Sequence, residues 1–115
     1  MPAASANKAA ATRDALFRAL SDPTRRAMFE RLMRDGELTV RALTDEAGVS
    51  QPMVSKHLGV LKEAGLVRDR PEGREVHYRA DARSLKPLVD WMTRYRAFWH
   101  ERFDHLDDLL NRMDQ

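Results

Sequence analysis

The clearest alternation of apolar and polar positions lies between Ser50 and Val67, which read SQPMVSKHLGVLKEAGLV. At about 100° per residue, the apolar side chains fall within one narrow arc of a helix. These residues are Val54, Leu58 and Leu61. The opposite face carries Gln51, Ser55, Lys56, Gly59, Lys62 and Glu63. Ser50 is a favourable N-cap, Pro52 is tolerated in a first turn and Gly65 favours a stop, so the pattern predicts a helix over about 51–64.

Two amphipathic stretches precede this helix. Apolar residues recur at helical spacing from Thr12 to Leu20, and a second helix is predicted from Pro23 to about Arg34, with Asp22 as its cap. The buried side of this second helix is predicted to hold Ala27, Met28, Phe29 and Leu32. Residues 1–11 are rich in alanine and poorly patterned, so they are predicted to form a flexible N-terminal arm.

A short helix and a hairpin complete the pattern around 51–64. Thr39 can cap a short helix before the turn at Gly48. After Gly65, two extended runs surround Pro71-Glu72-Gly73, and the second run alternates in polarity. We therefore expect a β-hairpin over about 66–80, with Arg70 and Arg74 on either side of its tip.

The order of these elements indicates a fold class. A short helix, a turn, a longer helix and a small hairpin are typical of a winged helix-turn-helix. The expected fold is mainly α with a small β-hairpin wing and about five helices. Residues 12–115 are expected to form one domain.

Aromatic and aliphatic residues dominate the last stretch, which is predicted to be one long helix over about 85–113. They fall in an arc of about 140° at about 100° per residue. This is more apolar surface than a short winged-helix core can cover, so a two-fold homodimer is expected. The predicted interface on this helix comprises Leu88, Trp91, Tyr95, Phe98, Trp99, Leu106 and Leu110.

Composition narrows the possible functions. The chain of 115 residues contains no cysteine, which excludes disulfides, thiolate metal sites and cysteine nucleophiles. It shows no signal-peptide core and no apolar run of about 18 residues, so we expect a cytoplasmic protein without a membrane partner. The segment 56–86 holds eight basic and five acidic residues, whereas 101–115 holds two basic and five acidic ones. Only the first segment is suited to a polyanion.

The polar face of the 51–64 helix suits a DNA major groove, because it offers an amide, a hydroxyl and lysines. The predicted DNA-binding residues are Ser50, Gln51, Pro52, Ser55, Lys56, Lys62, Arg70 and Arg74. Simpler explanations exist: the helix face could be merely solvated, Lys62 could interact with the helix dipole, and the two arginines could keep the hairpin soluble. His57 projects toward the apolar arc and is expected to pack rather than bind DNA.

Three segments together resemble the ArsR-type winged-helix transcriptional repressors, over about residues 16–80. These segments are ALSDPTRRAMFERL, LTDEAGVSQPMVSKHLGVLKEAGLV and REVHYRA. The resemblance implies a homodimer, paired through the first and last helices, that binds a pseudo-palindromic operator and blocks transcription. It assigns base reading to Gln51, Ser55 and Lys56 and adds Leu16 to the expected dimer interface.

Many members of this family release DNA when they bind a metal. This sequence contains only some of the residues that form the metal sites of the family. Thr39 and Arg41 stand where the family's thiolates would be. Of the family's metal site on the terminal helices, only one half has a match in spacing, at His105 and Asp108. His100 and Asp104, four residues apart, are a second possible pair of ligands. We expect no metal site and no cofactor. The effector stays open: a small organic molecule, a partner protein or none.

No catalytic constellation is apparent, because the sequence lacks an activated nucleophile, paired carboxylates in an apolar setting and a glycine-rich phosphate loop. An enzyme is therefore not expected. The sequence favours a sequence-specific DNA-binding transcriptional regulator, as a homodimeric repressor. The alternative is a protein-interaction module or anti-activator whose winged helix no longer binds DNA; it predicts that Gln51, Ser55 and Lys56 can be changed without consequence.

Overall fold

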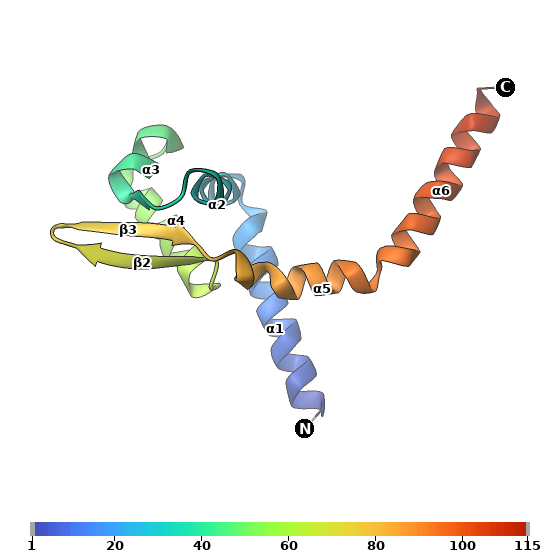
Figure 1. The fold of residues 1–115 in the computed structure, drawn as a ribbon, viewed down its shortest axis with the longest axis horizontal. Coiled ribbons are helices and arrows are strands. Elements are labelled where there is room, and N and C mark those ends of the chain that lie inside the picture. Colours follow the sequence, from blue (N-terminus) through green and yellow to red (C-terminus); the bar gives the residue numbers. More distant parts are fainter. Residues whose placement is uncertain (1, 115) are drawn as a thin grey trace.

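The structure, a computed structural model, describes the backbone of residues 2–114 and the side chains of residues 7–114. Within this part it contains six α-helices, a short 3₁₀ helix (η1) and three β-strands (Figure 1). The helices are α1 (Pro2–Ser21), α2 (Pro23–Asp35), α3 (Val40–Ala47), α4 (Gln51–Glu63), η1 (Ala82–Leu85), α5 (Lys86–Arg94) and α6 (Arg96–Met113). The strands are β1 (Leu38–Thr39), β2 (Val67–Glu72) and β3 (Glu75–Ala80).

The first helix is longer than its amphipathic pattern predicts. It begins at Pro2, so residues 2–11 of the expected flexible arm are helical; Met1 lies outside the described residues. Alanine has the highest helix propensity, which explains a helix without an apolar face. This half of α1 extends away from the body of the molecule (Figure 1), where no core imposes a periodic pattern.

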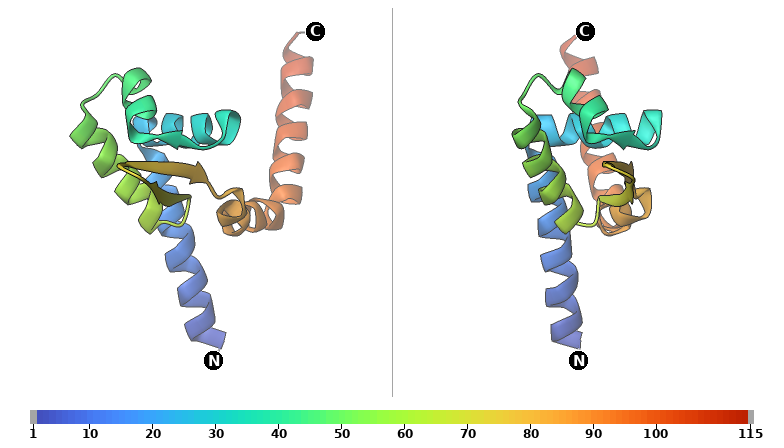
Figure 2. Two further views of the ribbon diagram at one scale, coloured as in Figure 1. Left: turned by 60° about the vertical axis from the view of Figure 1, so that its left-hand side comes forward. Right: turned by 90° about the vertical axis from the view of Figure 1, so that its left-hand side faces the viewer.

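The core lies where α1, α2, α3 and α4 meet the sheet (Figure 2). It includes residues predicted to be buried, such as Phe29, Leu43 and Leu58. Ala27 is an exception, because it is exposed on α2. Among the side chains of residues 7–114, the buried ones are Leu16, Ala19, Met28, Phe29, Leu32, Leu43, Val54, Leu58, Leu61, Leu66, Val67 and Leu88.

The helix boundaries around the turn follow the capping residues. The side chain of Asp22 accepts from the Arg25 N–H at 2.9 Å, and that of Thr39 accepts from the Ala42 N–H at 3.1 Å. Gly48, with φ +72°, turns the chain between α3 and α4. This left-handed conformation costs glycine little, which is why the turn falls there.

The hairpin is confirmed and gains a third strand, in the order β1-β3-β2. The two-residue β1 was not predicted, because two residues are too few to show alternation. The turn consists of Gly73 and Arg74, one residue later than predicted, with Gly73 at φ +62°. Pro71 lies within β2, and β2 is an edge strand, where proline removes no necessary sheet hydrogen bond.

The prediction of one long terminal helix over about 85–113 is wrong, because the structure divides this stretch at Tyr95 into α5 and α6. Tyr95 has φ −102° and ψ 7°, and no proline or glycine marks the break. Helix α5 packs on α1, with the ring of Trp91 edge-on to Phe17 at 5.6 Å, whereas α6 leaves the body (Figure 1). The apolar period continues across a one-residue break, so the sequence pattern does not reveal it.

The fold is a winged helix-turn-helix, mainly α with a small antiparallel sheet. It has six α-helices rather than about five because the terminal helix is divided. Within residues 2–114, no helix combines the length and the apolar character needed to cross a membrane.

Candidate nucleic-acid interface

Helix α4 presents two contrasting faces. Val54, Leu58 and Leu61 are fully buried against α2, α3 and β2. Gln51, Pro52, Ser55 and Lys56 are exposed on the other side. Among the described residues, no ion pair engages Lys56, and the side chains of Gln51 and Ser55 make no hydrogen bond within the protein. This face is therefore available to a ligand.

The first turn of α4 is fixed by Ser50. Its side-chain oxygen accepts from the Met53 N–H at 3.3 Å, as expected of an N-cap. Ser50 is also exposed. Capping leaves the helix N-terminus facing solvent, and such a terminus carries a partial positive charge that favours phosphate.

His57 is half-buried on the side of α4 that faces α2, in agreement with the predicted packing role. Its Nδ1 lies 3.5 Å from Nη1 of Arg25. Arg25 also donates through Nε to the carbonyl oxygen of Ala19 at 2.8 Å and through Nη2 to that of Arg18 at 3.2 Å. Arg25 thus joins the end of α1 to α4, a role not predicted for this arginine.

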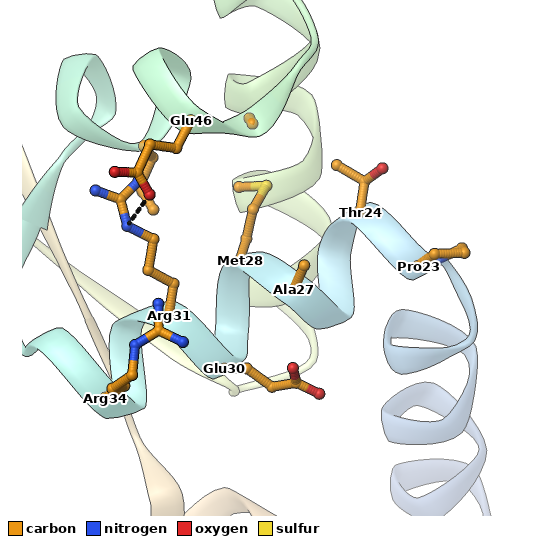
Figure 3. A pocket seen from close by; sticks show the side chains of 10 residues that line it. Pro23, Thr24, Ala27, Met28, Glu30, Arg31, Arg34 and Glu46 are labelled. Carbon is orange, nitrogen blue, oxygen red and sulfur yellow. Dashed lines mark ion pairs between the residues drawn. The ribbon is translucent and has the colours of Figure 1, made fainter.

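Arg31 connects α2 to α3. Its side chain is only 17% exposed. Nη1 donates to the carbonyl oxygen of Ala42 at 2.9 Å, and the buried Nε lies 3.5 Å from carboxylate oxygens of Asp35 and Glu46 without a well-formed hydrogen bond. A groove of about 400 Å³ lies between the two helices here (Figure 3). Arg31 therefore holds the first helix of the helix-turn-helix in place.

The wing is tied to the loop after α2 through Arg70. Its guanidinium pairs with Glu37 and, at 3.0 Å, with Glu72. His77 lies in the same cluster, with Nδ1 3.5 Å from Glu37. The hydrogen bond from Arg70 lowers the pKa of Glu37, and the same pairing raises the pKa of Arg70. The structure thus gives Arg70 an internal role that the sequence did not indicate.

Lys62 and Arg74, which were also predicted to contact DNA, differ in whether they have a partner within the protein. Lys62 pairs with Asp69 at 2.9 Å, and this hydrogen bond raises the pKa of Lys62 and lowers that of Asp69. Arg74 occupies the exposed hairpin turn, and no ion pair engages it among the described residues. Arg74 is therefore the more accessible cation of the wing.

The residues expected at the dimer interface fall into two groups. Leu16 and Leu88 lie in the core of the protomer, 1% and 8% exposed, which corrects their assignment to a surface. Their spacing matches a helix face, but that face packs inward. Trp91 is half-buried, and the others are exposed: Tyr95, Phe98, Trp99, Leu106 and Leu110. Phe103, Leu109 and Met113 are also exposed on α6 and were in the predicted apolar arc.

Histidine and carboxylate side chains do not gather into a metal-binding group of three among the side chains described. On α6, Nε2 of His100 lies 3.5 Å from Oδ2 of Asp104, both exposed. His105 and Asp108 are exposed on the same helix.

A winged helix-turn-helix with a capped, exposed recognition helix defines the DNA-binding transcriptional regulators as a class. Residues 20–70 match the protein family described as "Helix-turn-helix domain". The transcriptional repressor SdpR of Bacillus subtilis (strain 168) is 31% identical over 80 residues, covering 70% of this chain and 88% of SdpR. The regulator Rv2034 of Mycobacterium tuberculosis (strain ATCC 25618 / H37Rv) is 45% identical over 82 residues, covering 71% of this chain and 76% of Rv2034.

A solved structure agrees with these relatives. An ArsR-like transcriptional regulator from Rhodococcus sp. RHA1 superposes with a TM-score of 0.68 at 31% identity, covering 86% of this chain and 92% of that one. The chain belongs to the ArsR family of winged helix-turn-helix transcriptional regulators. It is a DNA-binding transcriptional regulator, and the comparisons do not favour a protein-interaction module in its place.

Proposed function

We propose that this protein is a homodimeric repressor that places α4 of each protomer in a DNA major groove. The observation that supports this most is the contrast between the faces of α4. The core fixes one face, and the other leaves Gln51, Ser55 and Lys56 without intramolecular partners. SdpR and several other relatives are named repressors, which supports repression as the outcome of binding.

Each side chain has a role that its chemistry suits. The amide of Gln51 pairs with a base edge, most favourably adenine, and Lys56 contacts guanine or a phosphate. The hydroxyl of Ser55 is short enough to approach either a base or the backbone. Ser50 and Pro52 shape the exposed N-terminus of α4, which faces a phosphate.

The wing adds a contact without sequence preference. Arg74 reaches a backbone phosphate from the hairpin turn, whereas Arg70 keeps the wing attached to the loop at Glu37. Lys62 contributes only if it exchanges Asp69 for a phosphate. Phosphate contacts position the protein, and α4 supplies the specificity.

Two protomers are needed to read both halves of a pseudo-palindrome. The exposed apolar surface of α5 and α6 supplies an interface for a second copy, with half-sites about one helical turn apart or a multiple of it, about 34–36 Å per turn. As a regulator related to bacterial proteins, it acts where the bacterial chromosome lies, in the cytoplasm.

Footprinting on the DNA upstream of its own gene, with operator titrations, tests this function. Replacing Gln51, Ser55 and Lys56 by alanine should raise the operator Kd at least about 100-fold, since each base-reading side chain contributes about 1–3 kcal/mol. The matched control replaces three exposed polar residues of α6, Asp104, Asp108 and Asn111, by alanine. Equal operator affinity in both variants would contradict the proposal.

A further inference from the structure

The groove between α2 and α3 has one charged end, and the rest of its lining is mainly apolar. Figure 3 shows Arg31, Arg34 and Glu46 together at one end and Pro23 and Thr24 at the other. The lining away from the charged end comprises Pro23, Thr24, Ala27, Met28, Leu43 and Ala47. The volume of about 400 Å³ and this mixture of apolar surface with a few polar groups are typical of sites for small molecules.

Arg31 supplies a hydrogen-bond donor that the protein itself does not use well. In the part of the chain that the structure describes, its buried Nε has no hydrogen-bond partner. The carboxylates of Asp35 and Glu46 lie only as near as 3.5 Å. Meanwhile Nη1 is held on the carbonyl oxygen of Ala42 at 2.9 Å, which fixes the orientation of the guanidinium. A ligand oxygen that accepts from Nε would satisfy a buried donor at little cost in ordering Arg31.

The charges that line the groove select a carboxylate as this ligand oxygen. Arg31 and Arg34 are balanced by Glu30 and Glu46, so the net charge of the lining is zero. The side chain of Glu46 is 69% exposed, and an exposed ion pair contributes little to stability, so Glu46 can turn into solvent at small cost. The groove then carries one positive charge in excess, which one carboxylate neutralises.

We propose that this groove binds a small organic carboxylate, whose charged group replaces Glu46 on Arg31 and whose apolar body lies along Ala27 and Ala47. The ion pair of Arg31 with Glu46 joins α2 to α3, and α3 packs on α4. A bound carboxylate breaks this pair, which loosens the position of the helix-turn-helix and lowers operator affinity. The effect on the operator rests on the proposed function, whereas the binding of the carboxylate does not.

Hexanoate is a suitable probe, because 1-hexanol and hexylamine have the same chain with a neutral or a cationic group. Each would be titrated into the full chain while the NMR shifts of the backbone amides are recorded. Hexanoate should shift the amides of Ala27–Arg31 and Leu43–Ala47, with a Kd on the order of 1 mM for so small a ligand. The other two should bind at least about 10-fold more weakly, because they offer Arg31 no carboxylate. Absence of these shifts, or equal binding of 1-hexanol, would overturn the proposal.

Three variants test the location of the site and the competition with Glu46. Ala27→Glu places a carboxylate in the groove at an exposed helical position and should raise the hexanoate Kd at least about 10-fold without unfolding the protein. Met33→Glu is the control, because it adds the same charge at an exposed position of α2 outside the lining. Glu46→Gln removes the competing carboxylate and should lower the hexanoate Kd about 2- to 5-fold. Equal binding by the first two variants, or weaker binding by Glu46→Gln, would contradict this site.

Operator titration with and without hexanoate separates this inference from the proposed function. Saturating hexanoate should raise the operator Kd of the wild type about 2- to 5-fold and should leave that of Ala27→Glu unchanged. Hexanoate that occupies the groove without changing operator affinity would contradict the regulatory effect. A protein that binds hexanoate in the groove but binds no operator would support the site and contradict only the proposed function.

Discussion

Ser50 has two roles at the N-terminus of α4: its side chain caps the helix, and it lies where a DNA phosphate is expected. Substitutions can separate the effect on stability from the effect on DNA binding. Ser50→Ala removes the oxygen that accepts from Met53 and should lower the free energy of unfolding by about 1 kcal/mol. Ser50→Asp keeps an N-cap but adds a negative charge where a phosphate is expected, so stability should persist while operator affinity falls. Denaturation and operator titration measure the two effects. Unchanged affinity in Ser50→Asp would argue against a phosphate at this helix end.

Arg70 and Arg74 lie close in sequence but should affect DNA binding differently. Arg74→Ala should weaken binding to all sequences about equally and reduce the salt slope, d log K/d log [salt], by about one. Arg70→Ala should leave that slope near its wild-type value, because Arg70 already pairs with Glu37 and Glu72. Operator titrations between about 50 and 200 mM salt measure both slopes. Equal reductions in the two variants would mean that Arg70 reaches DNA.

Residues whose partners are local could be predicted, and residues whose partners are distant could not. The caps at Asp22, Thr39 and Ser50 are readable because each accepts from a backbone N–H three residues ahead. Arg31 meets a carbonyl eleven positions away, and Arg70 meets Glu37 at a separation of 33. An arginine whose partner lies that far along the chain has the same local sequence as a solvated one.

Arg31 fixes the packing of α3 on α2. Arg31→Ala would leave the carbonyl of Ala42 and the carboxylate of Glu46 without this partner, and we expect the free energy of unfolding to fall by about 1–3 kcal/mol. Arg34→Ala is the matched control, because Arg34 is one turn away and 70% exposed. Urea denaturation compares the two variants. A similar small loss in both would show that Arg31 contributes no more than a surface charge.

The attachment of the wing should depend on acidity through Glu37. Its pKa is lowered from an ordinary value of 4.5 by the hydrogen bond from Arg70, so the pairing is fully present above 4.5 and is lost as pH falls through the lowered pKa. The stability difference between the wild type and Glu37→Gln should therefore be constant from about pH 7 to 5 and shrink below 4.5. Denaturation of both proteins across this range measures it, and a constant difference down to pH 3 would exclude the mechanism.

The terminal helices illustrate what periodicity omits. The apolar residues from Leu88 to Met113 follow one helical period in the sequence, yet the chain breaks at Tyr95. A pattern of side chains reports the face of a helix, and it does not report a local change of backbone direction that preserves the phase. For the same reason Leu88 was assigned to a surface although it packs into the protomer.

The shape of the whole molecule departs from that of a compact domain. Its radius of gyration is 18.7 Å, whereas a compact chain of this length has about 13 Å. The excess comes from α6 and the first half of α1, which project from the body (Figure 1). The acidic residues from Glu101 to Asp114 are thereby separated from the basic segment around α4 and the wing. We expect a polyanion to meet the basic segment and not the acidic helix, because like charges repel.

Dimerisation and operator binding should therefore be coupled. Leu110→Lys removes an apolar side chain from each protomer's part of the proposed dimer interface and places two charges there. At about 1.5–3 kcal/mol per leucine, the dimer Kd should rise at least about 100-fold. Operator occupancy should then require more protein and increase more steeply with its concentration, because two monomers must assemble on the DNA. Asn111→Lys is the control, since it adds the same charge at the adjacent outer position and should bind operator at least as tightly as the wild type. Sedimentation gives the dimer Kd and titration gives the occupancy. A Leu110→Lys protein that is monomeric yet binds operator like the wild type would show that the recognition helices do not depend on the paired terminal helices.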